Sequence, residues 1–172
     1  MSAVINRPTA ASSNADTATF RDAMSLLASA VTIITTDGPN GRHGFTASAV
    51  SSVSDAPPTL LVCVNRNTSA HPHLIAHGKL AINILAHSHD TLSTRFATSS
   101  LDMDARFAEG AWRQGASGLP ILADALVTLE CRIAEITEVA THTVIFAEVE
   151  TMDLRPEAGR GLVWFRRRYA EL

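Results

Sequence analysis

Apolar and polar residues alternate over two long stretches in the second half of the chain. The alternation runs through 125–139, as in Val-Thr-Leu-Glu-Cys-Arg-Ile, and returns over 143–154 after a break at 140–142. A period of two is typical of a strand with one exposed face. Shorter apolar or β-branched runs predict further strands over 31–36, 42–53, 59–64, 79–85 and 162–165. The pattern therefore predicts a mainly β fold of about seven strands.

Apolar residues at helical spacing predict a few peripheral helices. Phe20, Met24 and Leu27 lie on one stripe after the capping residue types at 16–19, which predicts a helix over 19–30. Further helices are expected over 69–75, with Ser69 as cap and Gly78 as terminator, from Ser88 through Phe96, and over 103–108. Because closure removes exposed sheet edges, the strands favour a closed or nearly closed antiparallel barrel.

Composition narrows the class of protein. The 172 residues suffice for one domain, which we expect over 17–172, and the Ala/Ser/Thr-rich residues 1–16 predict a disordered tail without a signal peptide. No apolar run is long enough to cross a bilayer, and a net charge of -3 argues against a nucleic-acid partner. Cys63 and Cys131 lie in apolar runs without a disulfide pattern, so we expect a reducing, cytoplasmic location.

The segment Gly44–Val53 places tiny or hydroxyl-bearing side chains along a predicted strand. Such a surface could receive a flat polar ligand, although an edge strand with a solvated Ser/Thr face has the same pattern. The next strand delivers Asn65 and Arg66 to its end, where a guanidinium can grip a phosphate. Asn83 is the one polar residue inside a buried strand, so its amide needs partners from the backbone or from a ligand.

The histidines and the basic tail are weaker signals. His71 and His73, like His87 and His89, are two residues apart and have no third ligand at matching spacing, so no metal site is expected. His142 lies at the bend between the two long strands, where it is either solvated or able to reach into a barrel mouth. The tail at 164–169 is either a basic, aromatic edge that touches a nucleotide or a solvated terminus.

Taken together, these segments resemble the short-chain flavin reductases, the small partners of two-component flavin-dependent monooxygenases. The resemblance runs through the segments 20–25, 31–39, 44–53, 55–66, 78–85, 141–142 and 161–165. It implies a Greek-key split β-barrel of the FMN-binding type, forming a homodimer with the flavin near the subunit interface. Two positions depart from the family pattern: Ala140 replaces a glycine, and Ser51 stands where close relatives often have cysteine.

The resemblance also implies which residues contact the cofactor. His142 would meet the nicotinamide side of the site as the catalytic residue, and Arg66 would anchor the flavin phosphate. The implied flavin-contacting residues are Thr46, Ala47, Ser48, Ser51, Ser52, Cys63, Asn65, Arg66, Ser69, Asn83 and Tyr169. Ser69 would lie near the phosphate and Asn83 at the ring edge.

The implied activity is hydride transfer from NADH or NADPH to FMN or FAD, followed by release of reduced flavin to a monooxygenase. In such enzymes the cofactors carry the chemistry and the protein aligns two rings. Two alternatives remain open: a flavoprotein that keeps its FMN and acts as electron carrier or oxidase, and a non-catalytic flavin- or haem-binding barrel. The sequence does not distinguish FMN from FAD, or NADH from NADPH.

Overall fold

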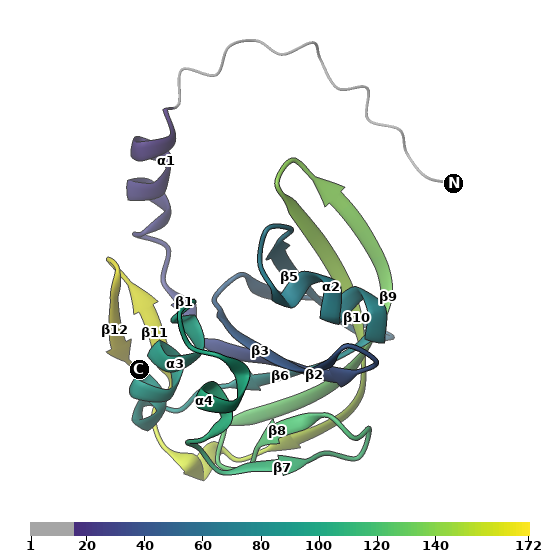
Figure 1. The fold of residues 1–172 in the computed structure, drawn as a ribbon. Coiled ribbons are helices and arrows are strands. Elements are labelled where there is room, and N and C mark those ends of the chain that lie inside the picture. The colour runs from purple at the N-terminus through teal and green to yellow at the C-terminus, as the bar shows by residue number, and fades with distance from the viewer. Residues whose placement is uncertain (1–15) are drawn as a thin grey trace.

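The computed structural model describes residues 16–172, which form mainly strands with a few short helices (Figure 1). The expectation of a tail over 1–16 lies outside the described residues, except for Asp16, which caps the first helix. The helices are α1 (Thr17–Met24), α2 (Ala70–His77), α3 (Asp90–Ala97), α4 (Met103–Phe107) and two 3-10 turns, η1 (His87–His89) and η2 (Pro156–Ala158). The strands are β1 (Ser29–Ala30), β2 (Thr32–Gly38), β3 (Gly41–Ala47), β4 (Val50–Asp55), β5 (Pro58–Asn65), β6 (Lys79–Ile84), β7 (Trp112–Gln114), β8 (Pro120–Leu122), β9 (Val127–Val139), β10 (His142–Leu154), β11 (Leu162–Phe165) and β12 (Arg168–Glu171).

Seven antiparallel strands form the largest sheet, in the order β3-β2-β6-β9-β10-β5-β4. Consecutive strands pair in β2–β3, β4–β5 and β9–β10, the long hairpin in Figure 1. β3 and β4 are the two edges, and no ladder within residues 16–172 joins them, so the sheet is not closed as a barrel. The mainly β class with few helices is confirmed, whereas full closure is not observed.

The core lies on both faces of β2. Ile34 packs with residues of β5, β6 and β10, and Ile33 packs on the other face against α3, α4 and β8. Thr32 and Thr36 are also buried, so five consecutive residues of this strand are shielded from solvent. A strand buried on both faces does not alternate, which explains why its sequence is β-branched throughout.

Gly44 sets how closely the helices approach β3. A Cβ at this position would lie 2.7 Å from the ring of Phe96 in α3 and 3.2 Å from that of Phe107 in α4. These two rings meet edge to face, with centroids 4.9 Å apart. The glycine therefore lets α3 and α4 pack directly against β3, beside the residues that form the candidate site.

The first helix is shorter than its sequence predicts. α1 ends at Met24, and Ser29–Ala30 instead pair with β11. The side chains of Phe20, Met24 and Leu27, which the sequence places on one stripe, are 56%, 47% and 63% exposed. In Figure 1 the helix stands away from the rest of the chain. Pairing with a distant strand has thus overridden the local helical signal.

The predicted strand over 42–53 is two strands rather than one. β3 ends at Ala47 and β4 begins at Val50, and Ser48 and Ala49 form the break between them. Ala49 still contributes its carbonyl oxygen, which accepts a hydrogen bond from the backbone N–H of Cys63 at 3.0 Å. The small residues of this segment therefore lie where the sheet divides.

Helix signals elsewhere hold with small shifts. Gly78 terminates α2 in the left-handed region at φ 72°, as predicted, but the Ser69 side chain does not cap that helix. Instead the Ser69 hydroxyl lies 3.1 Å from Nε2 of His43. The short strands β1, β7, β8 and β12 have no counterpart among the predicted elements. No helix within residues 16–172 has the length and apolar character that crossing a membrane requires.

Candidate active site

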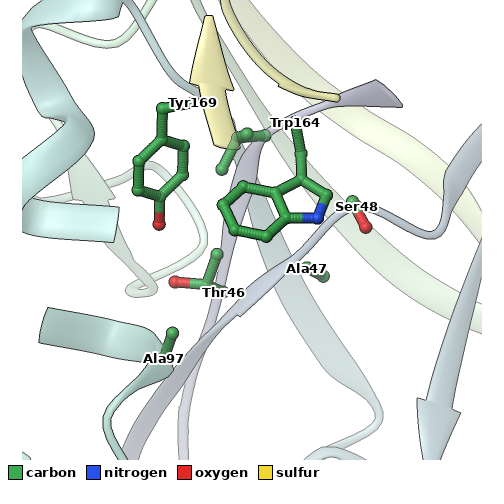
Figure 2. Close-up of a pocket in the computed structure, with 7 residues that line it drawn as sticks. Thr46, Ala47, Ser48, Ala97, Trp164 and Tyr169 are labelled. Carbon is green, nitrogen blue, oxygen red and sulfur yellow. The ribbon is translucent and has the colours of Figure 1, made fainter. Parts of the chain in front are cut away.

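A narrow slot lies over the end of β3 (Figure 2). Its volume is about 170 Å³, and Thr46, Ala47 and Ser48 form its floor. Trp164 and Tyr169 from the β11–β12 hairpin form one wall, with ring centroids 5.0 Å apart. Val31 and Ala97 complete the lining. Small floor side chains below two aromatic rings leave space for one flat ring system.

The slot opens into a larger polar hollow. Thr46 and Ala97 line both spaces, and the polar hollow has a volume of about 520 Å³. Its apolar base is formed by Phe45 and Phe96. Its other lining residues carry mostly hydroxyl, amide, imidazole or guanidinium groups: His43, Asn67, Thr68, Ser69, Ala70, Ser99 and Arg106.

Arg106 gives the polar hollow a buried positive charge. The residue is 5% exposed, and its guanidinium donates to the carbonyl oxygens of Gly44, Phe96, Thr98 and Leu101 at 2.9–3.2 Å. Burial lowers the pKa of Arg106, although an arginine remains protonated near neutral pH. It forms no ion pair with a carboxylate of residues 16–172, so carbonyl dipoles alone offset the charge. An anion in the hollow would complete this compensation.

The first turn of α2 adds a second attraction for anions. Ser69 and Ala70 line the polar hollow, and no side chain caps the helix there. Uncapped N–H groups at a helix N-terminus favour negative charge. A phosphate is therefore the ligand group that suits this end of the site.

His43 is a buried imidazole beside this charge. It is 4% exposed, and desolvation, followed by the nearby His73 and Arg106, lowers the pKa of His43 to about 4. Its ring centroid lies 4.7 Å from that of His73, and its Nδ1 has no hydrogen-bond partner within residues 16–172. The imidazole is thus neutral at physiological pH and adds no charge to the hollow.

On its other side the slot continues into an outer groove through Ser48. This groove has a volume of about 400 Å³ and is lined by residues 27–30, 48–51, Leu61 and Cys63. Slot, polar hollow and outer groove together form one trough along the division between β3 and β4. A long ligand with a flat ring and a terminal phosphate fits this succession of connected spaces.

The structure brings several of the predicted contact residues into this trough. Thr46, Ala47, Ser48 and Tyr169 line the slot, Ser69 lines the polar hollow, and Ser51 and Cys63 line the outer groove. Ser52 is exposed on β4 and lines none of the three spaces.

Asn83 lies apart from the trough. It is fully buried, its Nδ2 donates to the carbonyl of Ile33 at 2.9 Å, and its Oδ1 accepts from the N–H of Leu122 at 2.8 Å. Backbone groups therefore satisfy the amide that the family resemblance places at a flavin ring edge. Its role in this structure is to join β2, β6 and β8.

Asn65, Arg66 and His142 form a separate group at the turn of the β9–β10 hairpin. Arg66 donates to Glu138 at 2.7 Å and to the carbonyl of Ala140, which has a positive φ of 51°. Two of its N–H donors hold the turn and Arg66 lines none of the three spaces, so its role as phosphate anchor stays a prediction. His142 is exposed and pairs across the sheet with Asn65.

Two residues of the trough had no distinguishing signal in the sequence. Arg106 lies in a short helix whose sequence is compatible with a solvated charged face, and His43 follows a turn in a strand. Only the packing of α4 and α2 against β3 shows that Arg106 and His43 are buried. Within residues 16–172 no three side chains of metal-binding types lie close enough together to hold an ion.

Comparisons with known proteins agree with this geometry. Residues 24–172 match the family model described as flavin reductase like domain. The chain is 51% identical over 163 residues to the FMN reductase (NADH) RutF 1 of Methylorubrum extorquens (strain PA1), covering 95% of this chain and 80% of that protein.

Solved structures of similar fold are also flavin reductases or are named as such. A Haemophilus somnus 129PT protein provisionally called a flavin reductase superposes with a TM-score of 0.88 at 41% identity, covering 92% of this chain and all of that one. The NADH:FAD oxidoreductase of Streptomyces globisporus, solved with NAD and FAD fragments, has a TM-score of 0.84 at 30% identity, covering 91% of this chain and 93% of that one. The chain therefore belongs to the family of flavin reductase like domains, as its sequence motifs predict.

Proposed function

We propose that this protein is an NADH-dependent flavin reductase that passes reduced flavin to a monooxygenase. The observation that carries the proposal is the trough, in which a slot for a flat ring opens into a hollow lined by a buried guanidinium that has no carboxylate partner within residues 16–172. Its match to an FMN reductase (NADH) over nearly the whole chain supports the same activity. FMN has the required shape, a planar ring with a phosphate at the end of a polar chain.

The residues of the trough have distinct tasks. Thr46, Ala47 and Ser48 support the ring from below, and Tyr169 bounds it on one side. The first turn of α2 attracts the phosphate through its N–H groups, and Arg106, whose donors bind backbone carbonyls, attracts it through its positive charge. A bound flavin supplies the hydride-accepting centre. The protein contributes alignment of the two rings, which is the main source of catalysis in a reaction between two cofactors.

The exposed floor favours flavin as a substrate that comes and goes. Ser48 and Ala49 are exposed, and the outer groove beside them is open to solvent. Ring and phosphate would thus enter without rearrangement of the sheet. This favours a shuttle over a permanently held FMN, and the use of NADH favours the cytoplasm as the compartment.

We also propose that a second copy completes the molecule as a homodimeric split barrel. The apolar stripe of α1, formed by Phe20, Met24 and Leu27, is exposed and needs a cover. The hairpin turn with His142 is also exposed and would reach the trough of the partner rather than its own. Light scattering of the purified protein tests this arrangement: a monomer at micromolar concentration would contradict it.

Initial rates with each flavin and each nicotinamide test the function. We expect NADH oxidation that saturates with added FMN, because the flavin is a substrate. A rate indifferent to added flavin, in protein purified with a full complement of it, would indicate the permanently bound alternative. Absence of NADH oxidation with both flavins would leave the non-catalytic binding module.

A further inference from the structure

Ser93 connects the floor and the wall of the slot. It lies in α3 and is fully buried. Its hydroxyl is 2.9 Å from the hydroxyl of Tyr169, and its carbonyl accepts a hydrogen bond from Oγ1 of Thr46 at 2.6 Å. One buried residue thus contacts a floor residue through its backbone and a wall residue through its side chain.

The hairpin that carries Tyr169 has a strained turn. The turn between β11 and β12 consists of Arg166 and Arg167, with φ values of 51° and 59°. Two-residue turns of this kind strongly prefer Asn-Gly, since side chains other than glycine are strained at positive φ. The β11–β12 ladder and the hydrogen bond from the N–H of Arg166 to the carbonyl of Ser25 at 2.7 Å hold the backbone, whereas the phenol hydroxyl is held by Ser93.

Few other polar contacts hold the ring. Apart from Ser93, its hydroxyl has one partner within residues 16–172, Oγ1 of Thr94 at a longer 3.4 Å, and that oxygen already donates to the carbonyl of Asp90. Trp164 supplies an apolar contact with centroids 5.0 Å apart. Figure 2 shows the Tyr169 hydroxyl directed toward the side of the slot that Thr46 and Ala97 line.

We propose that Ser93 is a positioning residue for flavin reduction, which holds the Tyr169 phenol against the bound flavin ring. The inference rests on the proposed function and assigns a role to a residue that does not itself touch the flavin. Its effect passes through the Tyr169 hydroxyl alone, so it concerns flavin affinity more than the nicotinamide.

A double-mutant cycle tests the proposal. Ser93→Ala, Tyr169→Phe and the double variant are compared with the wild type by FMN titration without NADH and by steady-state rates. We expect FMN affinity to fall about fivefold in each single variant, because a phenol ring freed from this hydrogen bond must be ordered when FMN binds, and no further in the double variant. The NADH KM at saturating FMN should change less than twofold. Thr91→Ala, which removes an exposed hydroxyl from the same helix, is the matched control and should bind FMN as the wild type does.

A spectroscopic readout reports on the ring directly. Trp164 contacts Tyr169, so its fluorescence emission should change in Ser93→Ala and not in Thr91→Ala, while Trp164→Phe identifies which part of the signal belongs to this indole. Unchanged FMN affinity together with reduced thermal stability would assign Ser93 a purely structural role and overturn the proposal. Additive losses in the double variant would overturn it as well. A wild type that binds FMN but does not oxidise NADH contradicts the proposed function, while the binding cycle still decides the role of Ser93.

Discussion

Replacing Ala47 by leucine tests whether the low floor of the slot is what admits the flavin ring. Ala47 is half-buried, and the slot above it has a volume of about 170 Å³. If each added carbon takes roughly the 30 Å³ that a water molecule occupies, three carbons remove roughly 90 Å³, about half of the space. A ring lifted by about 1 Å already loses roughly a hundredfold in rate, so kcat/KM for FMN should fall at least about a hundredfold in Ala47→Leu.

The assay is NADH oxidation with varied FMN, together with FMN titration of the free protein. Ala76→Leu is the matched control, because Ala76 lies exposed in α2 and lines no part of the trough. It should retain wild-type KM and kcat. Thermal unfolding must show that both variants are folded, because Ala47 is half-buried and also packs against the core cluster that contains Ile34 and Val62. Wild-type kinetics in a folded Ala47→Leu protein would refute the assignment of the slot to the ring.

Three further substitutions separate structural from functional residues. Arg66→Ala should lower the free energy of unfolding by at most about 1 kcal/mol, since its pair with Glu138 is largely exposed, and should change the FMN KM less than twofold; a larger rise in KM would restore it as a phosphate anchor. Asn83→Ala should lower the free energy of unfolding in urea by about 2 kcal/mol, because it leaves the N–H of Leu122 without its partner, and should leave the FMN KM unchanged. A variant with wild-type stability and weakened FMN binding would contradict this. The pKa of His43 is about 4 when folded and 6.5 otherwise, so the unfolded chain binds more protons between these pH values and stability falls as pH drops below about 6.5. Between pH 7 and pH 5 the His43 contribution to this loss is about 2 kcal/mol, and the pH dependence of unfolding in His43→Leu should be weaker by that amount; an unchanged pH dependence would show that the imidazole is not held neutral.

The sequence predicted the site best where local signals and tertiary packing agree. Thr46, Ala47 and Ser48 indicated the floor of the slot, because their side chains are small in any fold. Gly78 ended its helix as expected, since its position after the last turn and its conformational freedom act locally. The main strands were also predicted correctly, because the alternation of apolar and polar residues is a local signal.

The charged end of the site could not be found from local patterns. The sequence suggests Arg66, at a strand end, as a phosphate anchor, but in the structure two of its donors bind the β9–β10 turn, which lies more than seventy residues further along the chain. Arg106 has no signal in its local sequence, and in the structure Gly44 admits α4 so close to β3 that its guanidinium is buried. Both outcomes depend on which distant backbone carbonyls each guanidinium meets, and sequence spacing does not specify that.

The open division of the sheet has a consequence for how the protein behaves without its ligand. β3 and β4 are edge strands, and the floor of the trough lies at the ends where they part. Unpaired strand edges are templates for association with other chains. A bound flavin would cover these edges and so reduce self-association of the protein. Protein without flavin should therefore be the form that precipitates first on storage.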